Sequence, residues 1–449
     1  MGTDTVREQA ADEAAERRRE QRGWYVYDWA CSVYSTSVLT VFLGPYLTSV
    51  AKAAADADGF VHPLGIPLRA GSFFAYCVSA SVILSIFVMP LAGAAADRTG
   101  RKKPLLAVAA YLGAAATAGM FFLDGDRYLL GGLLLIVANA SLAVSMVLYN
   151  SYLPQIAPPE ERDAVSSRGW AFGYAAGSLV LVANLILYTA HDTFGVSETT
   201  AVRICLASAG IWWGAFTLVP LKRLRDRRTT SSSGTPTHGW RQLAATVRDL
   251  RRQPLTLAFL LAYLVYNDGI QTVISQASVY GSEELGLDQS TLIVAVLLVQ
   301  LLAVAGALGM GRLARTYGAK RTILGSLVAW TVTLGAGYFL PAGAPVWFFV
   351  LAAGIGLVLG GSQALSRSLF SHLVPPGKEA EYFSAYEMSD RGMSWLGPLL
   401  FGLTYQLTGS YRDAIISLVA FFVLGFVLLA RVPVRQAVRD AGNPIPDRI

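Results

Sequence analysis

An acidic side chain, Asp268, lies deep inside a long apolar run of this sequence. It follows Pro254, where the run begins, by 14 residues, or about 21 Å along a helix that rises 1.5 Å per residue. An ionisable group within a membrane span costs about 2.5–3.5 kcal/mol on insertion scales and usually lines a pathway. Burial favours the neutral acid and a cationic ligand reverses that preference, so we predict that Asp268 binds a proton or an ammonium group. The alternative is a structural acid satisfied by the neighbouring Tyr266 or Asn267.

Several polar and aromatic residues near this acid are further candidates for solute binding. Gln271 follows Asp268 by three residues and therefore lies on nearly the same helix face, where its amide could bond a polar solute. Asn267 and Tyr266 directly precede the acid, and Tyr266 could form an aromatic wall or a cation–π contact for an amine. Polar side chains in spans also bond neighbouring helices, so packing is the alternative for each.

A second acid, Asp28, lies near the start of another apolar run. It is four residues, or about 6 Å, beyond Trp24, which predicts a position in a gate close to the membrane surface. Tyr27 precedes it and could contact an amine, although anchoring at the membrane interface is the usual role of such a tyrosine. We include both residues among the candidates for substrate or proton binding.

The composition defines the elements that must position these residues. Of 449 residues, 54% are hydrophobic and 15% charged, against about 25% charged in an ordinary soluble domain, which excludes a soluble enzyme. The abundant glycine and tryptophan, 43 and 9 residues, suit membrane helices and membrane interfaces. The three cysteines, Cys31, Cys77 and Cys205, lie in apolar runs and suggest neither a disulfide framework nor a metal site.

A helix needs about 20 mainly apolar residues to cross the hydrocarbon core of a membrane, and twelve runs satisfy this. We expect an all-α polytopic membrane protein with twelve transmembrane helices arranged as two pseudo-symmetric six-helix bundles. The predicted spans are 24–50, 70–96, 104–123, 128–153, 168–190, 201–220, 254–281, 288–311, 322–341, 345–370, 384–408 and 411–432.

The basic residues predict the orientation of these spans. Only five of the 36 Lys and Arg residues fall in odd-numbered loops, so the other 31 lie in the tails and even-numbered loops. The positive-inside rule then places both termini in the cytoplasm. The net charge of +6 is therefore a signal of topology rather than of a nucleic-acid-binding surface.

The chain also contains an internal repeat around a basic central segment. Three residues of one loop recur 218 positions later: Gly93, Gly100 and Lys102 correspond to Gly311, Gly318 and Lys320. Two six-helix halves related by duplication are typical of secondary transporters, with the substrate site near the bilayer midplane. We predict a cytoplasmic tail at 1–23, a first bundle at 24–220, a basic linker at 221–253, a second bundle at 254–432 and a second tail at 433–449.

The first of these repeated loops has the properties of a gate. From Gly93 to Lys103 it reads Gly-Ala-Ala-Ala-Asp-Arg-Thr-Gly-Arg-Lys-Lys and resembles the signature loop of the major facilitator superfamily. Glycine permits close helix approach, the acid can pair with a basic group or a helix N-terminus, and the basic residues bind anionic headgroups. A simple positive-inside anchor is the alternative. The candidate gate residues are Gly93, Asp97, Arg98, Gly100, Arg101 and Lys102.

The repeated loop, with Gly311, Arg315 and Gly318, is a second candidate gate element. Arg315 replaces the acid there, so a charge latch cannot simply be copied to the second half. A nucleotide-binding loop is excluded because six residues separate Gly93 from Gly100, where a P-loop has four, and because no Ser or Thr follows the lysine.

The first and seventh spans resemble one branch of that superfamily more closely. The segments Tyr27-Asp28-Trp29-Ala30 and 266–274 resemble the branch that includes the vacuolar amino-acid effluxer of yeast and uncharacterised bacterial transporters. This resemblance implies export of amino acids or similar small solutes. The chain departs from the branch at Cys31, commonly a small polar Asn, and in the additional acids Glu387 and Asp390.

We therefore expect a secondary transporter that moves a small solute across the cytoplasmic membrane by alternating access, with the proton as a candidate coupling ion. It is expected to be a monomer in the lipid bilayer, without a cofactor, a metal or a nucleic-acid partner. A proton-coupled drug exporter is the first alternative, but its fifth span usually carries a Gly-Pro motif, and here Gly397-Pro398 lies in the eleventh. An intramembrane enzyme, suggested only by Ser362 and His372, lacks the nucleophile-elbow pattern. A transporter-derived sensor is the third alternative.

Overall fold

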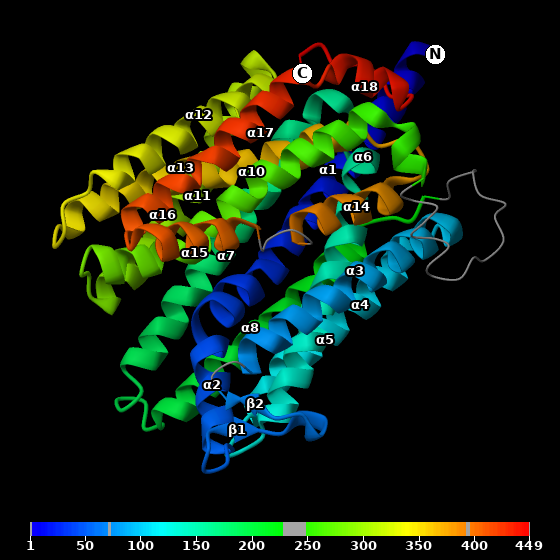
Figure 1. Ribbon diagram of the computed structural model, residues 1–449. Coiled ribbons are helices and arrows are strands. Elements are labelled where there is room, and N and C mark those ends of the chain that lie inside the picture. Colours follow the sequence, from blue (N-terminus) through cyan, green and yellow to red (C-terminus); the bar gives the residue numbers. More distant parts are fainter. Residues whose placement is uncertain (1, 71–72, 228–247, 392–395, 449) are drawn as a thin grey trace. The chain divides into compact units, whose positions relative to one another are not determined.

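The chain is helical almost throughout its described length. The computed structural model describes residues 2–70, 73–227, 248–391 and 396–448 (Figure 1). Its one described sheet is a short antiparallel pair, β1 (Phe60–Val61) and β2 (Leu68–Arg69), in which Phe60 is opposite Arg69. Ten helices of the described part are long and apolar enough to cross a membrane. The prediction of an all-α polytopic membrane protein is confirmed.

Two predicted spans are not among these ten helices. The run 322–341 corresponds to α12 (Ala319–Tyr338), and the run 384–408 to α14 (Glu379–Arg391) and α15 (Leu396–Thr408). Residues 392–395, between α14 and α15, lie outside the described residues. The count of twelve spans therefore remains a prediction.

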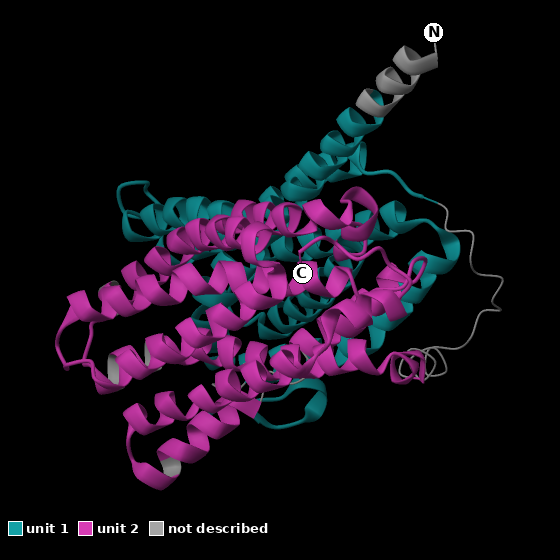
Figure 2. Ribbon diagram, turned by 90° about the horizontal axis from the view of Figure 1, so that it is seen from above, with its two compact units in different colours: residues 1–149, 175–234 teal, residues 150–174, 235–449 magenta. Residues whose placement is uncertain are grey.

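The helices form two compact units, which are coloured separately in Figure 2. Unit 1 contains residues 1–149 and 175–234, and unit 2 contains residues 150–174 and 235–449. Residues 150–174, which the sequence analysis assigned to the first bundle, thus pack with the second half of the chain. Most of the predicted linker, residues 228–247, lies outside the described residues.

Unit 1 is built on a helix that begins well before the first apolar run. Its elements are α1 (Gly2–Val33), the π-helix η1 (Tyr34–Phe42), α2 (Leu43–Ala53), the 3-10 turn η2 (Pro63–Gly65), α3 (Phe73–Thr99), α4 (Lys102–Gly119), the 3-10 turn η4 (Met120–Phe122), α5 (Tyr128–Asn150) and α8 (Glu198–Arg223). The helix α7 (Arg162–Thr189) contributes its second part.

The predicted cytoplasmic tail is therefore a continuous extension of the first membrane helix. Glu16 and Glu20 of α1 form ion pairs with Arg225 and Arg227, which follow α8. A glycine at position 23 lets the two helices approach, because a Cβ there would lie 2.7 Å from Cβ of Arg223.

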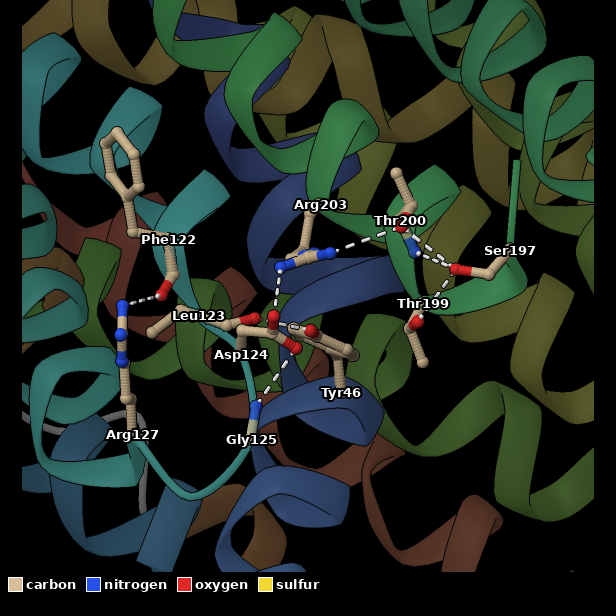
Figure 3. A network of polar contacts seen from close by, with 10 residues as sticks. All are labelled: Tyr46, Phe122, Leu123, Asp124, Gly125, Arg127, Ser197, Thr199, Thr200 and Arg203. Carbon is tan, nitrogen blue, oxygen red and sulfur yellow. Dashed lines mark hydrogen bonds and ion pairs between the residues drawn. The ribbon is translucent and has the colours of Figure 1, made fainter. Parts of the chain in front are cut away.

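Elsewhere in unit 1, an ion pair and a hydrogen bond join three segments. Arg203 of α8 forms an ion pair with Asp124 at 3.0 Å and donates to Oγ1 of Thr200 at 3.2 Å (Figure 3). The hydroxyl of Tyr46 in α2 donates to the carbonyl of Leu123 in the same turn. These bonds fix the turn between η4 and α5 against α2 and α8.

Unit 2 contains the end of α5, the short α6 (Leu153–Ile156), the 3-10 turn η5 (Pro159–Glu161) and the first part of α7. The second half of the chain adds α10 (Pro254–Val279), the π-helix η6 (Tyr280–Glu284), α11 (Gln289–Tyr317), α12, α13 (Pro345–Ser371), α14, α15, α16 (Tyr411–Ser417), α17 (Val419–Arg431) and α18 (Val434–Asp440).

An aromatic cluster fills the core of unit 2 where α10, α13 and α14 meet. Tyr263 and Tyr386 stack with ring centroids 4.4 Å apart, and Phe370 stacks on Tyr386 at 5.0 Å. Phe383 contacts Phe370 edge to face at 5.2 Å. Such pairs add about 0.5–1.5 kcal/mol each to the burial of their surface and hold the three helices in fixed positions.

The internal repeat has a structural counterpart in two glycines. Gly100, between α3 and α4, has φ of +61°, and Gly318, between α11 and α12, has φ of +88°. Side chains other than glycine rarely adopt such angles, so each loop reverses direction at the same position of the repeated motif.

Candidate functional site

Asp268 lies in α10 with its carboxylate against Gly397 of α15. Its Oδ2 accepts a hydrogen bond from the backbone N–H of Gly397, in the first turn of α15 as described, at 2.8 Å. The side chain is 3% exposed, and its second oxygen, Oδ1, has no hydrogen-bond partner among the described residues. The backbone N–H of Gly397 stabilises the carboxylate on one side, and the second oxygen is left unsatisfied.

Only glycine allows α15 to approach α10 this closely. A Cβ at Gly397 would overlap Oγ1 of Thr272 and lie 2.8 Å from its Cβ. Thr272 is itself fixed, because its hydroxyl donates to the carbonyl of Asp268 at 2.7 Å. The contact between Asp268 and Gly397 therefore requires glycine at position 397, because Thr272 lies one turn along α10 from the acid.

Asn267 points to a second acid on another helix. Its Nδ2 donates to Oδ1 of Asp390 in α14 at 2.6 Å, and the hydroxyl of Tyr263 donates to the same oxygen at 3.0 Å. The amide oxygen of Asn267 is buried and has no hydrogen-bond partner among the described residues. Adjacent residues of α10 thus contact α14 through Asn267 and α15 through Asp268.

The other two candidates from the seventh span differ from each other. Tyr266 is fully buried and shares a 2.6 Å hydrogen bond with Oγ of Ser366. It also packs closely against Gly425, where an added Cβ would lie 2.6 Å from the Cβ of Tyr266. It belongs to the packed contact of α10 with α13 and α17. Gln271 is half-buried, and its side chain forms no hydrogen bond recorded for the described part of the chain. Neither expected hydrogen-bond donor, Tyr266 or Asn267, is the partner that satisfies Asp268.

In unit 1, Asp28 lies in an aromatic enclosure. Its Oδ2 accepts from the hydroxyl of Tyr149 at 2.6 Å, and Tyr149 stacks on Trp24 with centroids 4.3 Å apart. The indole N–H of Trp24 donates to the carbonyl of Tyr149 at 2.9 Å. Tyr27 is fully buried, and the centroid of its ring lies 5.1 Å from that of Tyr149. The hydroxyl of Tyr27 has no hydrogen-bond partner among the described residues.

The repeated loops contain one buried ion pair. Asp97 and Lys102 lie 3.3 Å apart and are both buried, whereas Arg98 is half-buried and Arg101 exposed. The backbone N–H of Lys103 donates to Asp226 at 2.8 Å, which ties this loop to the segment after α8. Gly93, which precedes Asp97 by four residues, is also buried.

In the second loop, Gly311 provides a close contact and Arg315 is exposed. A Cβ at Gly311 would lie 2.7 Å from Cβ of Ser167 in α7. The glycine therefore allows the start of α7 to pack directly on α11 within unit 2.

A fully buried arginine in the same region was not predicted as a functional residue. Arg367 of α13 is 1% exposed, and its Nε and Nη2 donate to Oγ and the carbonyl of Ser166 in α7 at 2.9 and 2.8 Å. Its Nη1 donates to Oδ1 of Asn150 at 3.3 Å, and its guanidinium lies 5.3 Å from the ring of Trp170. Asn150 in turn donates to Glu387 of α14 at 2.8 Å. The available signal was that Arg367 is the one charged residue in the apolar run 345–370.

A second arginine makes a parallel contact nearby. Arg162, the first residue of α7, donates to the carbonyl of Ser371 at 2.9 Å, and its Nη1 lies 3.4 Å from Nδ1 of His372. Burial, and secondarily the adjacent guanidinium, lower the pKa of His372 well below its usual range. We call Asn150, Arg162, Ser166, Arg367 and Glu387 the arginine network. It joins residues 150–174 to α13 and α14.

This architecture is shared with solved transporters. The structure matches the E. coli fucose:proton symporter with a TM-score of 0.69 and 14% sequence identity, covering 92% of this chain and 97% of the symporter. It matches the proton:xylose symporter XylE with a TM-score of 0.65 and 15% identity, over 93% of this chain and 95% of that one. A bacterial homologue of the iron transporter ferroportin gives a TM-score of 0.65 at 17% identity. The fold is that of the major facilitator superfamily.

Sequence comparison then gives the branch. The chain belongs to the family described as "Vacuole effluxer Atg22 like", whose sequence model matches residues 16–442. An uncharacterised MFS-type transporter of Bacillus subtilis, YxiO, is 30% identical over 419 residues, covering 92% of this chain and 95% of the relative. Autophagy-related protein 22-1 of Aspergillus niger is 25% identical, over 94% of this chain and 90% of the relative. The resemblance predicted from the sequence is confirmed, and the chain is a transporter rather than an enzyme.

Proposed function

We propose that this secondary transporter exports amino acids or similar small solutes that carry an ammonium group, and that proton binding at Asp268 drives the export. The observation that carries the proposal is the geometry of Asp268, a carboxylate with one oxygen bonded to the backbone N–H of Gly397 in α15 and the other buried without a partner among the described residues. A proton or an ammonium group would satisfy that second oxygen.

Competition between the proton and the solute ammonium for the carboxylate of Asp268 would couple proton flux to solute flux. A buried carboxylate with an unsatisfied oxygen gains free energy from either a proton or a cation, but not from both at once. Solute and proton would then occupy Asp268 alternately and cross the membrane in opposite directions.

Asn267 and Asp390 provide the second part of the proposed site. The amide oxygen of Asn267 is a buried acceptor without a partner among the described residues, and Asp390 is half-buried beside it. A solute ammonium near Asp268 could donate to that amide oxygen as well, because an ammonium has several N–H groups. Asp28 and Tyr27, in the aromatic enclosure of unit 1, are candidates for the gate or for a second proton site, and Gln271 for a contact with the polar part of the solute.

We propose that the arginine network closes the cytoplasmic end of the pathway. It joins a loop that the distribution of basic residues predicts to be cytoplasmic to α13 and α14 of the second half. Its hydrogen bonds would have to break when that end opens during alternating access. The same predicted orientation has both termini in the cytoplasm, and we propose the cytoplasmic membrane as the location of the protein.

Flux of labelled amino acids in proteoliposomes, with and without an imposed pH gradient, tests the proposal. The wild type is expected to show gradient-dependent flux, and Asp268→Asn is expected to lose this dependence while inserting normally. Asp288→Asn is the matched control, because the carboxylate of Asp288 also accepts a hydrogen bond from a backbone N–H, that of Thr291, but is exposed. If the wild type transports none of the amino acids, the proposed solute class is wrong. If Asp268→Asn keeps an unchanged gradient-driven flux, Asp268 does not take part in the coupling.

A further inference from the structure

We propose that a basic cleft at the start of α12 binds the phosphate headgroup of an anionic phospholipid. The cleft has a volume of about 650 Å³ and lies between the first turns of α12 and the short helix α18. Four basic side chains line it, Lys320, Arg321, Arg435 and Arg439, and none of its lining residues is acidic. Such basic pockets next to membrane helices suit anionic headgroups.

Lys320 fixes one positive charge at the wall of this cleft. Its ammonium donates to the carbonyls of Ala430 and Val432 at 2.9 and 2.7 Å, where α17 ends. An ammonium has three N–H groups, so these two bonds leave one for a ligand. Arg321 follows directly in the first turn of α12, whose N-terminus has no side-chain cap, and an anion is favourable at that position.

The remaining charges come from one face of α18. Arg435 and Arg439 are four residues apart and exposed, whereas Val434 and Val438 are buried and hold the helix against the protein. Like charges at this spacing repel and destabilise a helix by a few tenths of a kcal/mol. An anion bound between the two guanidinium groups would reverse that effect.

An apolar stripe continues from the cleft along α12. Leu324 lines the cleft, and Val328 and Val332, four and eight residues further on, are 50% and 65% exposed. Residues at this spacing lie on nearly the same helix face, so an acyl chain could follow the stripe from a headgroup in the cleft. Free phosphate would use the charges but not this stripe, which favours a phospholipid as the ligand.

Binding of phosphatidylglycerol to the purified full-length protein in detergent tests this inference. Native mass spectrometry would compare phosphatidylglycerol with phosphatidylcholine of the same acyl chains, and inorganic phosphate would be added as a competitor. The triple variant Arg321→Gln, Arg435→Gln, Arg439→Gln is expected to bind phosphatidylglycerol on the order of tenfold more weakly than the wild type. Lys320 is retained because of its bonds to α17.

The matched control removes three other exposed charges of the second half, with Arg248→Gln, Arg251→Gln and Arg252→Gln. This control is expected to stay within about twofold of the wild type, since general attraction between charges is screened and weak. Equal loss in the two triple variants, or no loss in either, would overturn the proposal. Displacement by millimolar phosphate with no preference for phosphatidylglycerol would assign the cleft to a soluble anion instead.

A single variant tests the cleft without removing any bond. Gln436 lines the cleft and is exposed, so Gln436→Glu adds a negative charge with little effect on folding. It is expected to weaken phosphatidylglycerol binding severalfold and to leave phosphatidylcholine binding unchanged. Wild-type binding of phosphatidylglycerol by this variant would contradict the assignment.

Discussion

Replacing Arg367 with methionine should release residues 150–174 from α13. The guanidinium donates three hydrogen bonds to Ser166 and Asn150 at 2.8–3.3 Å, and charge-assisted bonds contribute about 1.5–3 kcal/mol each. Burying the guanidinium costs several kcal/mol, which offsets most of this sum. We therefore expect a net loss of about 2 kcal/mol for Arg367→Met, which has a similar length. That change corresponds to a factor of about 30 in an opening equilibrium.

Thiol labelling at the neighbouring Ser368 measures that equilibrium. Ser368 is fully buried, so a cysteine there should react with a maleimide only when the arginine network is open. The three native cysteines, Cys31, Cys77 and Cys205, are buried and would be replaced by serine in the background used for labelling. The labelling rate of Ser368→Cys should rise about 30-fold with Arg367→Met.

Arg367→Lys is the graded control for this experiment. It keeps the charge but loses the planar fork that bonds two groups at once, so its labelling rate should fall between those of the wild type and the methionine variant. If Arg367→Met leaves the labelling rate unchanged while the protein stays folded, the arginine network does not hold the cytoplasmic end of the pathway closed.

Three further changes test other parts of the structure. Gly397→Ala should displace α15 from Thr272 and reduce transport, with a cost of about 1–3 kcal/mol, measured by flux and by thermal unfolding. Asp97→Asn removes the charge 3.3 Å from the buried Lys102 and should lower the free energy of unfolding by about 3 kcal/mol. Burial lowers the pKa of His372, so this residue contributes stability above about pH 6.5 that is lost as pH falls, by up to about 1.4 kcal/mol per pH unit. His372→Gln should remove this part of the pH dependence in unfolding measurements.

Each of these variants has a control or an outcome that contradicts it. Gly402→Ala lies in the same helix as Gly397 with nothing within 4 Å of its added Cβ, and should leave transport unchanged. For Asp97, the exposed Asp58→Asn should have no effect on unfolding, and an equal effect would argue against the buried pair. A pH profile of stability that is identical in wild type and His372→Gln would show that the histidine is not titrating on unfolding.

The helices could be predicted because the membrane imposes one requirement on every span. Continuous apolar runs of about 20 residues are visible in the sequence, and the repeat of Gly100 at Gly318 identified two loops that each contain a glycine with positive φ. The extent of α1 was not predicted, because its first 22 residues are polar and give no hydropathy signal. Glu16 and Glu20 pair with residues beyond α8, about 200 positions further along the chain, and this pairing is likewise not visible in the sequence.

The candidate site could be predicted only one residue at a time. Asp268 was identified because an acid inside an apolar run is costly, but its partner Gly397 lies 129 positions further along the chain. Arg367 has the same kind of signal, and its partners lie about 200 positions away in α7. Pairing over such separations depends on how helices pack, which a single sequence does not reveal.

The uninterrupted first helix has a mechanical consequence. About 22 residues of α1 precede Trp24, and at 1.5 Å per residue they form a rigid arm of about 33 Å in line with the segment that carries Asp28. The ion pairs to Arg225 and Arg227 join this arm to the residues that follow α8. A fluorescent label near its free end would therefore move through a larger arc than Asp28 itself, so a change of tilt too small to detect at the acid could be followed from outside the membrane.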